Sequence, residues 1–164
     1  MLLVLAAYAH VGDVLDTLDA HVDPATPSRV HVEATFGLVT LEGDAGAWVC
    51  HEAVTAPGVF AAPHYVQGST GRFAAWNSGP NDGRDGEPVW TSADRCDWTA
   101  LTGLAGQLVA EVSLRGDEAW AATATSGVTN GLYRTVDGAF VPAGVSSDTD
   151  IFLSVRAEGP AIWA

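Results

Sequence analysis

The sequence has no lysine, and this absence, together with an excess of acidic residues, limits the partners that the chain can bind. All seven basic residues are arginines, against 20 aspartates and glutamates, which gives a formal net charge of −13. A surface of this charge repels nucleic-acid phosphates and anionic lipid headgroups. No segment approaches the roughly 20 consecutive apolar residues that a membrane-spanning helix needs. The composition therefore argues against nucleic-acid binding and predicts no membrane span.

Cysteine is scarce as well. The two cysteines are Cys50 and Cys96, and no Cys-x-x-Cys pair exists. A cysteine-rich zinc site and a dithiol redox motif are therefore not supported. In an exported protein the even count permits one disulfide between Cys50 and Cys96, whereas two separate buried thiols are the alternative.

The N-terminus has only part of a secretory signal. Residues 1–9 are apolar and end in Ala7-Tyr8-Ala9, a small-x-small pattern that suits signal cleavage. A basic region and a longer apolar core are missing. We expect the remnant of a signal peptide, with a buried strand or helix as the alternative. A signal remnant predicts a secreted, periplasmic or cell-surface location in a bacterium.

Glycine and proline are abundant and spread along the chain. With 18 glycines, 8 prolines and 48% hydrophobic residues, the sequence is typical of many short strands joined by turns. Residues 10–20 show both helical and strand spacing, and we interpret 17–22 as a strand. Further strands are expected at 29–35, 36–41, 47–53, 60–67, 71–77, 87–92, 97–101, 107–115, 118–124, 131–136, 140–145, 151–156 and 161–163.

The chain repeats itself at long intervals. An acidic turn followed by an aromatic residue occurs three times, with the aromatics at Trp48, Trp98 and Phe140, 50 and 42 residues apart. Similar strand sequences precede each turn. A period of about 40–50 residues is that of a four-stranded propeller blade.

The three turns resemble the Asp-box, or BNR, repeats of sialidase-like and sortilin-like β-propellers. The segments that carry the resemblance are Asp44-Ala-Gly-Ala-Trp48, Ser92-Ala-Asp94-Arg-Cys-Asp-Trp98 and Thr135-Val-Asp137-Gly-Ala-Phe140. Each is one or two residues shorter than the family box. The likeness covers residues 22–164, nearly the whole chain.

This resemblance implies an all-β fold, a partial β-propeller of about three to four antiparallel four-stranded blades. Residues 10–164 would form a single domain with blades at 17–56, 57–105, 106–147 and an incomplete one at 148–164. In the family the box closes the hairpin between the third and fourth strands of a blade. The acidic side chain caps backbone amides of the turn, and the aromatic covers the hairpin from the core side. We therefore assign structural roles to Asp44, Asp94, Asp137 and their aromatics.

No catalytic constellation accompanies the repeats. The arginine triad and the Tyr–Glu pair of sialidases cannot be matched to the arginines and tyrosines present. The five histidines, at positions 10, 21, 31, 51 and 64, lack ligand spacing, and neighbours in the expected strand Cys50-His51-Glu52 point to opposite faces. The acidic loop 81–87 could hold Ca²⁺, but a solvated hairpin loop is favoured. We predict no catalytic residue, no cofactor and no metal.

The sequence predicts a non-catalytic, exported propeller module that binds a protein or a glycan, as a fragment of a longer protein. A degenerate or partial sialidase-type glycoside hydrolase is the alternative, and a truncated gene product without independent function is a third. A partial propeller leaves open blade edges. Besides the fragment, the alternatives are pairing between two copies of the chain and a compact four-bladed or sandwich-like arrangement that uses the N-terminal strand.

Overall fold

A computed structural model describes residues 17–23, 26–59, 62–79 and 81–164. The expected signal remnant at residues 1–9 lies outside the described residues. The fold is all-β, as predicted, with antiparallel four-stranded sheets. No helix of the described part is long and apolar enough to cross a membrane.

Three sheets follow one another along the chain, and each has its four strands in sequence order. The first sheet contains β1 (Thr17–Val22), β2 (Arg29–Ala34), β3 (Gly37–Glu42) and β4 (Ala45–Cys50). The second contains β5 (His64–Gln67), β6 (Phe73–Trp76), β7 (Val89–Ser92) and β8 (Thr99–Leu101). The third contains β9 (Val109–Arg115), β10 (Glu118–Thr123), β11 (Asn130–Val136) and β12 (Ala139–Ser147). A two-stranded hairpin of β13 (Arg156–Glu158) and β14 (Ala161–Trp163) follows.

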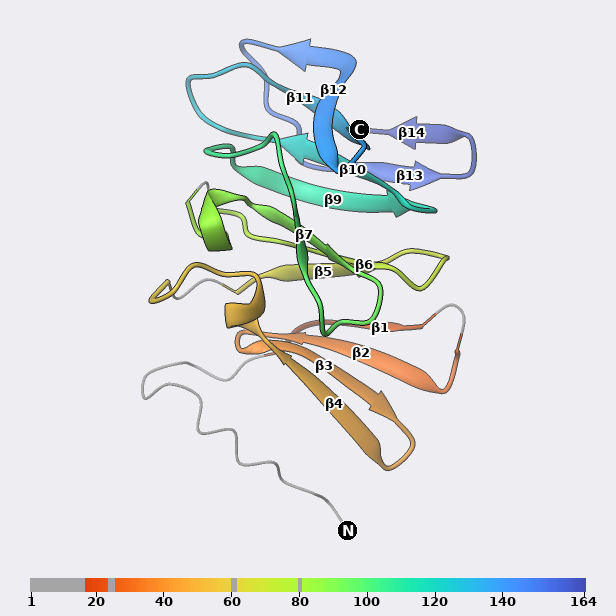
Figure 1. The fold of residues 1–164 in the computed structure, drawn as a ribbon. Helices are drawn as coiled ribbons and strands as arrows, with labels where there is room; N and C mark the ends of the chain where they lie inside the picture. Colours follow the sequence, from red (N-terminus) through yellow and green to blue (C-terminus); the bar gives the residue numbers. More distant parts are fainter. Residues whose placement is uncertain (1–16, 24–25, 60–61, 80) are drawn as a thin grey trace.

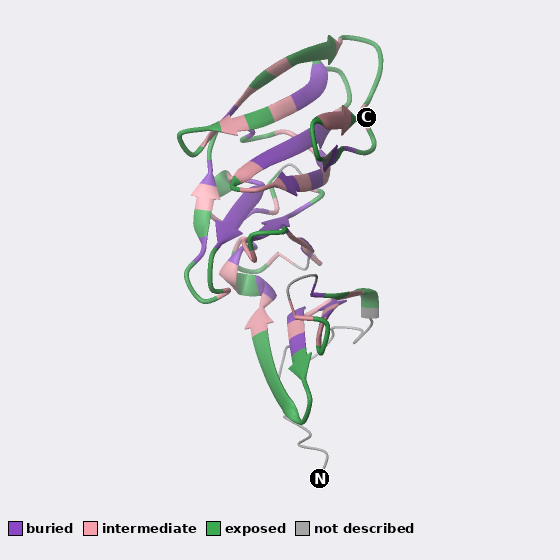
Figure 2. Cartoon of the chain, turned by 90° about the vertical axis from the view of Figure 1, so that its right-hand side faces the viewer, coloured by how far each residue is buried: buried purple, intermediate pink, exposed green. Residues whose placement is uncertain are grey.

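The sheets are stacked one above another from the N-terminal to the C-terminal end (Figure 1). A separate hydrophobic cluster fills each of the three interfaces in this stack. The buried residues lie where sheets face one another, whereas the β3–β4 hairpin is largely exposed near the N-terminal end (Figure 2).

Strands in the middle of the stack are buried on both faces. All four residues of β6 are buried, with Phe73 and Ala75 in the cluster toward the first sheet and Ala74 and Trp76 in the cluster toward the third. Since side chains alternate between faces, such a strand reads as a continuous apolar run. The Ala residues keep the neighbouring sheets close.

The expected strand at 47–53 ends earlier than predicted. After β4, residues His51–Ala53 form a short 3-10 helix. The His51 carbonyl accepts hydrogen bonds from the amides of Val54 and Thr55, which turns the chain away from the sheet. The expected strand through Glu52 was therefore wrong, although the Cys50 thiol still lies 3.9 Å from Glu52 Oε2.

The strand expected at 151–156 was also wrong, because most of this segment lacks a ladder partner. The Phe152 amide donates to the Thr123 carbonyl, and the Val155 amide donates to the Glu111 carboxylate. Separate hydrogen bonds therefore hold the segment against the third sheet. A regular strand ladder, between β13 and β14, begins only at Arg156.

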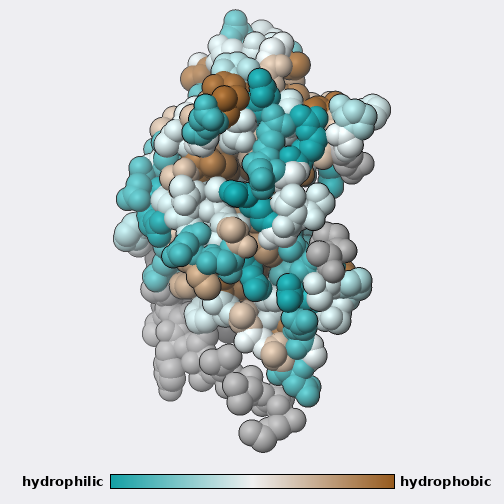
Figure 3. Space-filling view, turned by 45° about the vertical axis from the view of Figure 1, so that its right-hand side comes forward, coloured by the Kyte–Doolittle hydropathy of each residue, from teal (hydrophilic) through white to brown (hydrophobic). Residues whose placement is uncertain are grey.

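The surface mixes residues of different hydropathy. The face seen in Figure 3 has hydrophilic and near-neutral residues, with hydrophobic residues in small separate patches. Two 3-10 turns, His51–Ala53 and Arg84–Gly86, are the helical elements of the described residues.

Candidate functional site

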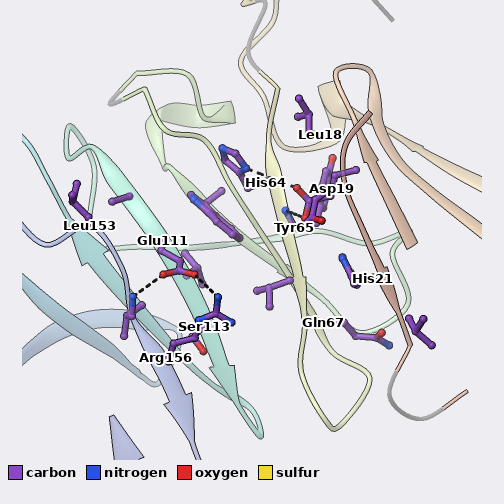
Figure 4. Close-up of a pocket in the computed structure, with 17 residues that line it drawn as sticks. Leu18, Asp19, His21, His64, Tyr65, Gln67, Glu111, Ser113, Leu153 and Arg156 are labelled. Atoms are coloured by element: carbon purple, nitrogen blue, oxygen red, sulfur yellow. Dashed lines mark hydrogen bonds and ion pairs between the residues drawn. The ribbon is translucent and has the colours of Figure 1, made fainter. Parts of the chain in front are cut away.

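The first strands of the three sheets meet at one open cavity of about 750 Å³, which we call the central cavity. Figure 4 shows β1, β5 and β9 side by side along it, with the segment that leads into β13 next to β9, at the end away from β1. The lining residues are Leu18, Asp19, His21, Val22, Glu33, His64, Tyr65, Val66, Gln67, Trp76, Ala110, Glu111, Val112, Ser113, Leu153, Val155 and Arg156. Residues from four separate parts of the chain thus form one cavity.

Several cavity residues carry polar atoms without partners. His21 Nε2, Gln67 Oε1 and Trp76 Nε1 are excluded from solvent and make no hydrogen bond within the described structure. A buried polar group left unsatisfied costs roughly 1–3 kcal/mol. The three residues come from β1, β5 and β6, and unsatisfied polar groups on residues that line a cavity are typical of a site completed by a ligand, an ion or water.

Two glutamates hold the cavity walls together. Glu33 Oε1 on β2 accepts the Tyr65 amide of β5 at 3.1 Å, and Glu111 Oε2 on β9 accepts the Val155 amide at 2.8 Å. Glu111 Oε1 also lies 3.8 Å from Arg156 Nη2. Glu33 thus joins the first sheet to β5 of the second sheet. Glu111 joins the third sheet to the segment just before β13.

Asp19, His21 and Glu33 form a group of potential metal ligands, with one ligand atom from each within 4.8 Å of the others. Asp19 and Glu33 are directly opposite on the β1–β2 ladder, and His21 is two residues from Asp19 on the same face. Glu33 is buried, His21 is half-buried and Asp19 is exposed. The His64 Nδ1 atom of β5 lies 3.8 Å from Glu33 Oε2.

Ligand spacing along the chain does not reveal this group, because Asp19 and Glu33 meet through cross-strand pairing. Two signals were present, the alternation Asp19-x-His21 and the Glu33 that follows the next turn. Only the strand register brings them together.

A polar layer continues behind the metal-ligand group. His31 is fully buried, and Thr40 Oγ1 accepts a hydrogen bond from Arg95 Nη1 at 2.6 Å and contacts His31 Nδ1 at 2.9 Å. Because Thr40 accepts from Arg95, its hydroxyl proton is available to donate to Nδ1. Burial lowers the pKa of His31, in agreement with a neutral imidazole. His31 therefore supports the wall of the site as an uncharged ring.

Asp94 caps its turn in the manner that the resemblance implies. Its Oδ1 accepts the amides of Cys96 at 2.8 Å and Asp97 at 3.0 Å. Ser92 Oγ accepts the Arg95 amide at 2.7 Å. Trp98 is buried beside this turn, and its Nε1 donates to the Arg95 carbonyl at 3.0 Å.

The other two boxes are looser. Asp44 and Asp137 occupy two-residue turns between the third and fourth strands, and no hydrogen bond of either carboxylate is found among the described residues. Phe140 is buried in the core, but Trp48 is 40% exposed and packs edge-on against Phe36. The expectation that each aromatic covers its hairpin from the core side is therefore wrong for Trp48, whose side chain is largely open to solvent in the described structure.

Cys50 and Cys96 are free thiols, so the disulfide permitted by the sequence is not formed in the structure. Both nevertheless line one hollow of about 310 Å³ between the first and second sheets. The acidic loop 81–87 contributes no ligand group among the described residues, and its Arg84 stacks on Trp90.

No protein-family model matches this chain, and no curated protein matches it significantly.

Proposed function

We propose that this chain is a non-catalytic, exported propeller-like module that binds a glycan in the central cavity. The observation that carries the proposal is that three residues lining one open cavity each have a buried polar atom without a partner, namely His21 Nε2, Gln67 Oε1 and Trp76 Nε1. A site of this kind gains hydrogen bonds when a polar ligand enters it.

The order of the sheets supports the propeller interpretation. In a propeller, four-stranded antiparallel blades follow one another in sequence around a central channel. Here three four-stranded sheets follow in chain order, and β1, β5 and β9, their first strands, line the same cavity. The box turns at 43–44, 93–98 and 137–138 lie between the third and fourth strands of successive sheets.

The shape and charge of the cavity favour a glycan over a protein. A volume of about 750 Å³ lies in the range of small-ligand sites, whereas protein partners need broad and flatter surfaces. The carboxylates of Asp19, Glu33 and Glu111 favour a neutral or amino sugar over an acidic one.

The experiment compares the wild type with a variant whose cavity is blocked. Ala110→Trp places a large side chain on the β9 wall, and Gln67→Ala removes an unsatisfied acceptor. On a glycan array and by calorimetry with the best glycan, both variants should bind at least about tenfold more weakly, a loss of about 1.4 kcal/mol.

Ala45→Trp is the matched control, because Ala45 is exposed on β4 and does not line the central cavity. It should bind like the wild type. If no glycan binds, or if the Ala110→Trp and Ala45→Trp proteins bind alike, the proposal is wrong.

A glycoside hydrolase is the second candidate. Asp19 and Glu33 place two carboxylates next to each other at the cavity, with oxygens less than 4.8 Å apart, and glycosidases also use a pair of carboxylates. A sialidase-type substrate receives less support, because Arg156 alone among the arginines of the described residues lines the cavity. Turnover of a fluorogenic glycoside that is lost in Asp19→Asn would favour this candidate over pure binding.

A further inference from the structure

We propose that Asp19, His21 and Glu33 bind a divalent transition-metal ion of the zinc type at the wall of the central cavity. This inference goes beyond glycan binding and does not depend on it. It rests on the β1–β2 register, on the buried and unpartnered Nε2 atom of His21 and on the charges around the group.

The register places the three ligands on one face of the sheet. Asp19 pairs with Glu33 across the ladder, and His21 follows Asp19 at the next position on the same side. In a tetrahedral zinc site, ligand atoms held about 2.1 Å from the metal lie roughly 3.4 Å from one another. Here the ligand atoms lie within 4.8 Å, so small side-chain rotations are enough to bring them onto one ion.

Two features of the group are unfavourable without a cation. The carboxylates of Asp19 and Glu33 are directly opposite on an antiparallel pair, and like charges in that position repel each other. The second feature is the His21 Nε2 atom, which is buried and has no hydrogen-bond partner in the described structure. A divalent ion neutralises the carboxylates and accepts the imidazole lone pair.

Neighbouring basic side chains do not neutralise the carboxylates of Asp19 and Glu33. The ion-pair partner recorded for Glu33 is His64, at 3.8 Å and with a side chain that is 42% exposed. Arg29, the arginine of β2, is instead paired with Asp23 and Glu42. The Asp19–Glu33 pair therefore keeps an excess of negative charge.

The donor set selects the class of ion. Ca²⁺ and Mg²⁺ prefer shells made only of oxygen, whereas one imidazole and two carboxylates suit Zn²⁺ and related transition metals. Three protein ligands leave a coordination position open toward the cavity, and His64 is placed to hydrogen-bond Glu33 as an outer partner.

The experiment measures zinc binding by the full chain. The protein is stripped with EDTA, returned to metal-free buffer and titrated with ZnCl₂ by calorimetry. The wild type should bind one ion per chain, and its melting temperature should rise with zinc because the metal binds the folded state. CaCl₂ at the same concentrations should give no saturable binding.

Asp19→Asn and His21→Gln should each weaken zinc binding by about tenfold or more. Asp44→Asn is the matched control, because it removes an exposed carboxylate of the same sheet outside the ligand group. Asp19 is itself exposed, so its variant should fold, and melting without metal checks this for each protein.

A second readout is the NMR signal of the His21 ring nitrogens, which should shift when zinc is added to the wild type. The proposal is overturned if zinc does not bind saturably, or if Asp19→Asn and His21→Gln bind it as the wild type does. The zinc measurements do not test glycan binding. A glycan array on which nothing binds likewise leaves the zinc proposal standing.

Discussion

Glu33 shows how one side chain can serve both the fold and the site. Its Oε1 accepts the Tyr65 amide, which ties the first sheet to the second, and its other oxygen faces His64. A buried carboxylate is tolerated when backbone donors and a partner satisfy it. Because the same carboxylate faces Asp19 across the ladder, the junction between two sheets is also the wall of the candidate metal site.

Asp94 and Asp44 show that equivalent box positions differ in what they contribute. The backbone amides of Asp97 and Cys96 hold the pKa of the Asp94 carboxyl below its ordinary value. No hydrogen bond of the Asp44 carboxylate is found in the part of the chain that the structure describes. The turn at Asp94 is therefore the one that the carboxylate holds in place.

Asp94→Ala should lower the melting temperature at pH 7, and Asp44→Ala should change it little. A carboxyl whose pKa falls on folding adds stability above its unfolded pKa of about 3.9, and this stability is lost as pH falls through the folded pKa. The difference in melting temperature between the wild type and Asp94→Ala should thus become smaller as pH is lowered below about 4. Thermal unfolding of both proteins at a series of pH values measures this difference. A difference in melting temperature that does not change with pH would contradict the capping role of Asp94.

At the scale of elements, β6 and β10 explain how the sheets stack. In β10, Ala119 and Ala121 pack toward the second sheet, while Trp120 and Ala122 pack toward the C-terminal segment. β6 carries Phe73 and Trp76 on opposite faces, each beside one alanine, and the buried centre of β10 carries Trp120 among three alanines. Close packing of this kind tolerates little change in volume.

The β2–β3 turn depends on a glycine. Gly37 has φ +132°, and a Cβ there would lie 1.9 Å from the Val49 carbonyl oxygen. Gly37→Ala should destabilise the protein by about 3 kcal/mol or more, because backbone atoms of β4 must move. Gly43→Ala is the control, with φ +57° and open space, and should cost about 1 kcal/mol. Urea unfolding measures both, and equal losses would contradict the clash.

At the scale of the whole molecule, a stack of sheets with three small cores carries a net charge of −13. The negative groups repel one another more in the compact state than in the expanded chain. The fourth strand of each sheet, β4, β8 or β12, is an edge of that sheet, which fits the expected pairing between copies. Pairing itself stays a prediction.

The melting temperature should rise with sodium chloride in the presence of EDTA. Salt shortens the screening length from about 30 Å at 0.01 M to about 3 Å at 1 M, which weakens the repulsion. The double variant Asp44→Asn/Asp137→Asn removes two exposed charges and should respond less to salt. A melting temperature that stays constant or falls between these salt concentrations would show that repulsion does not limit stability.

Local rules predicted most strands but failed where the chain leaves its sheet. The alternation at 17–22 correctly indicated β1, and the turn residues placed the hairpins. The segments after Cys50 and before Arg156 have strand-like composition, yet their amides and carbonyls bond outside any ladder. Pattern alone does not say whether an apolar run finds a partner strand.

The sequence by itself determined the all-β class, the period of the strands and the acidic surface, because alternation, turn chemistry and charge act over a few residues. The tertiary structure alone decided the candidate site. Asp19 and Glu33 meet through the β1–β2 register, and the central cavity forms only where β1, β5 and β9 converge from distant parts of the chain. Contacts between residues far apart in sequence depend on how whole sheets pack, and no short stretch of sequence encodes that packing.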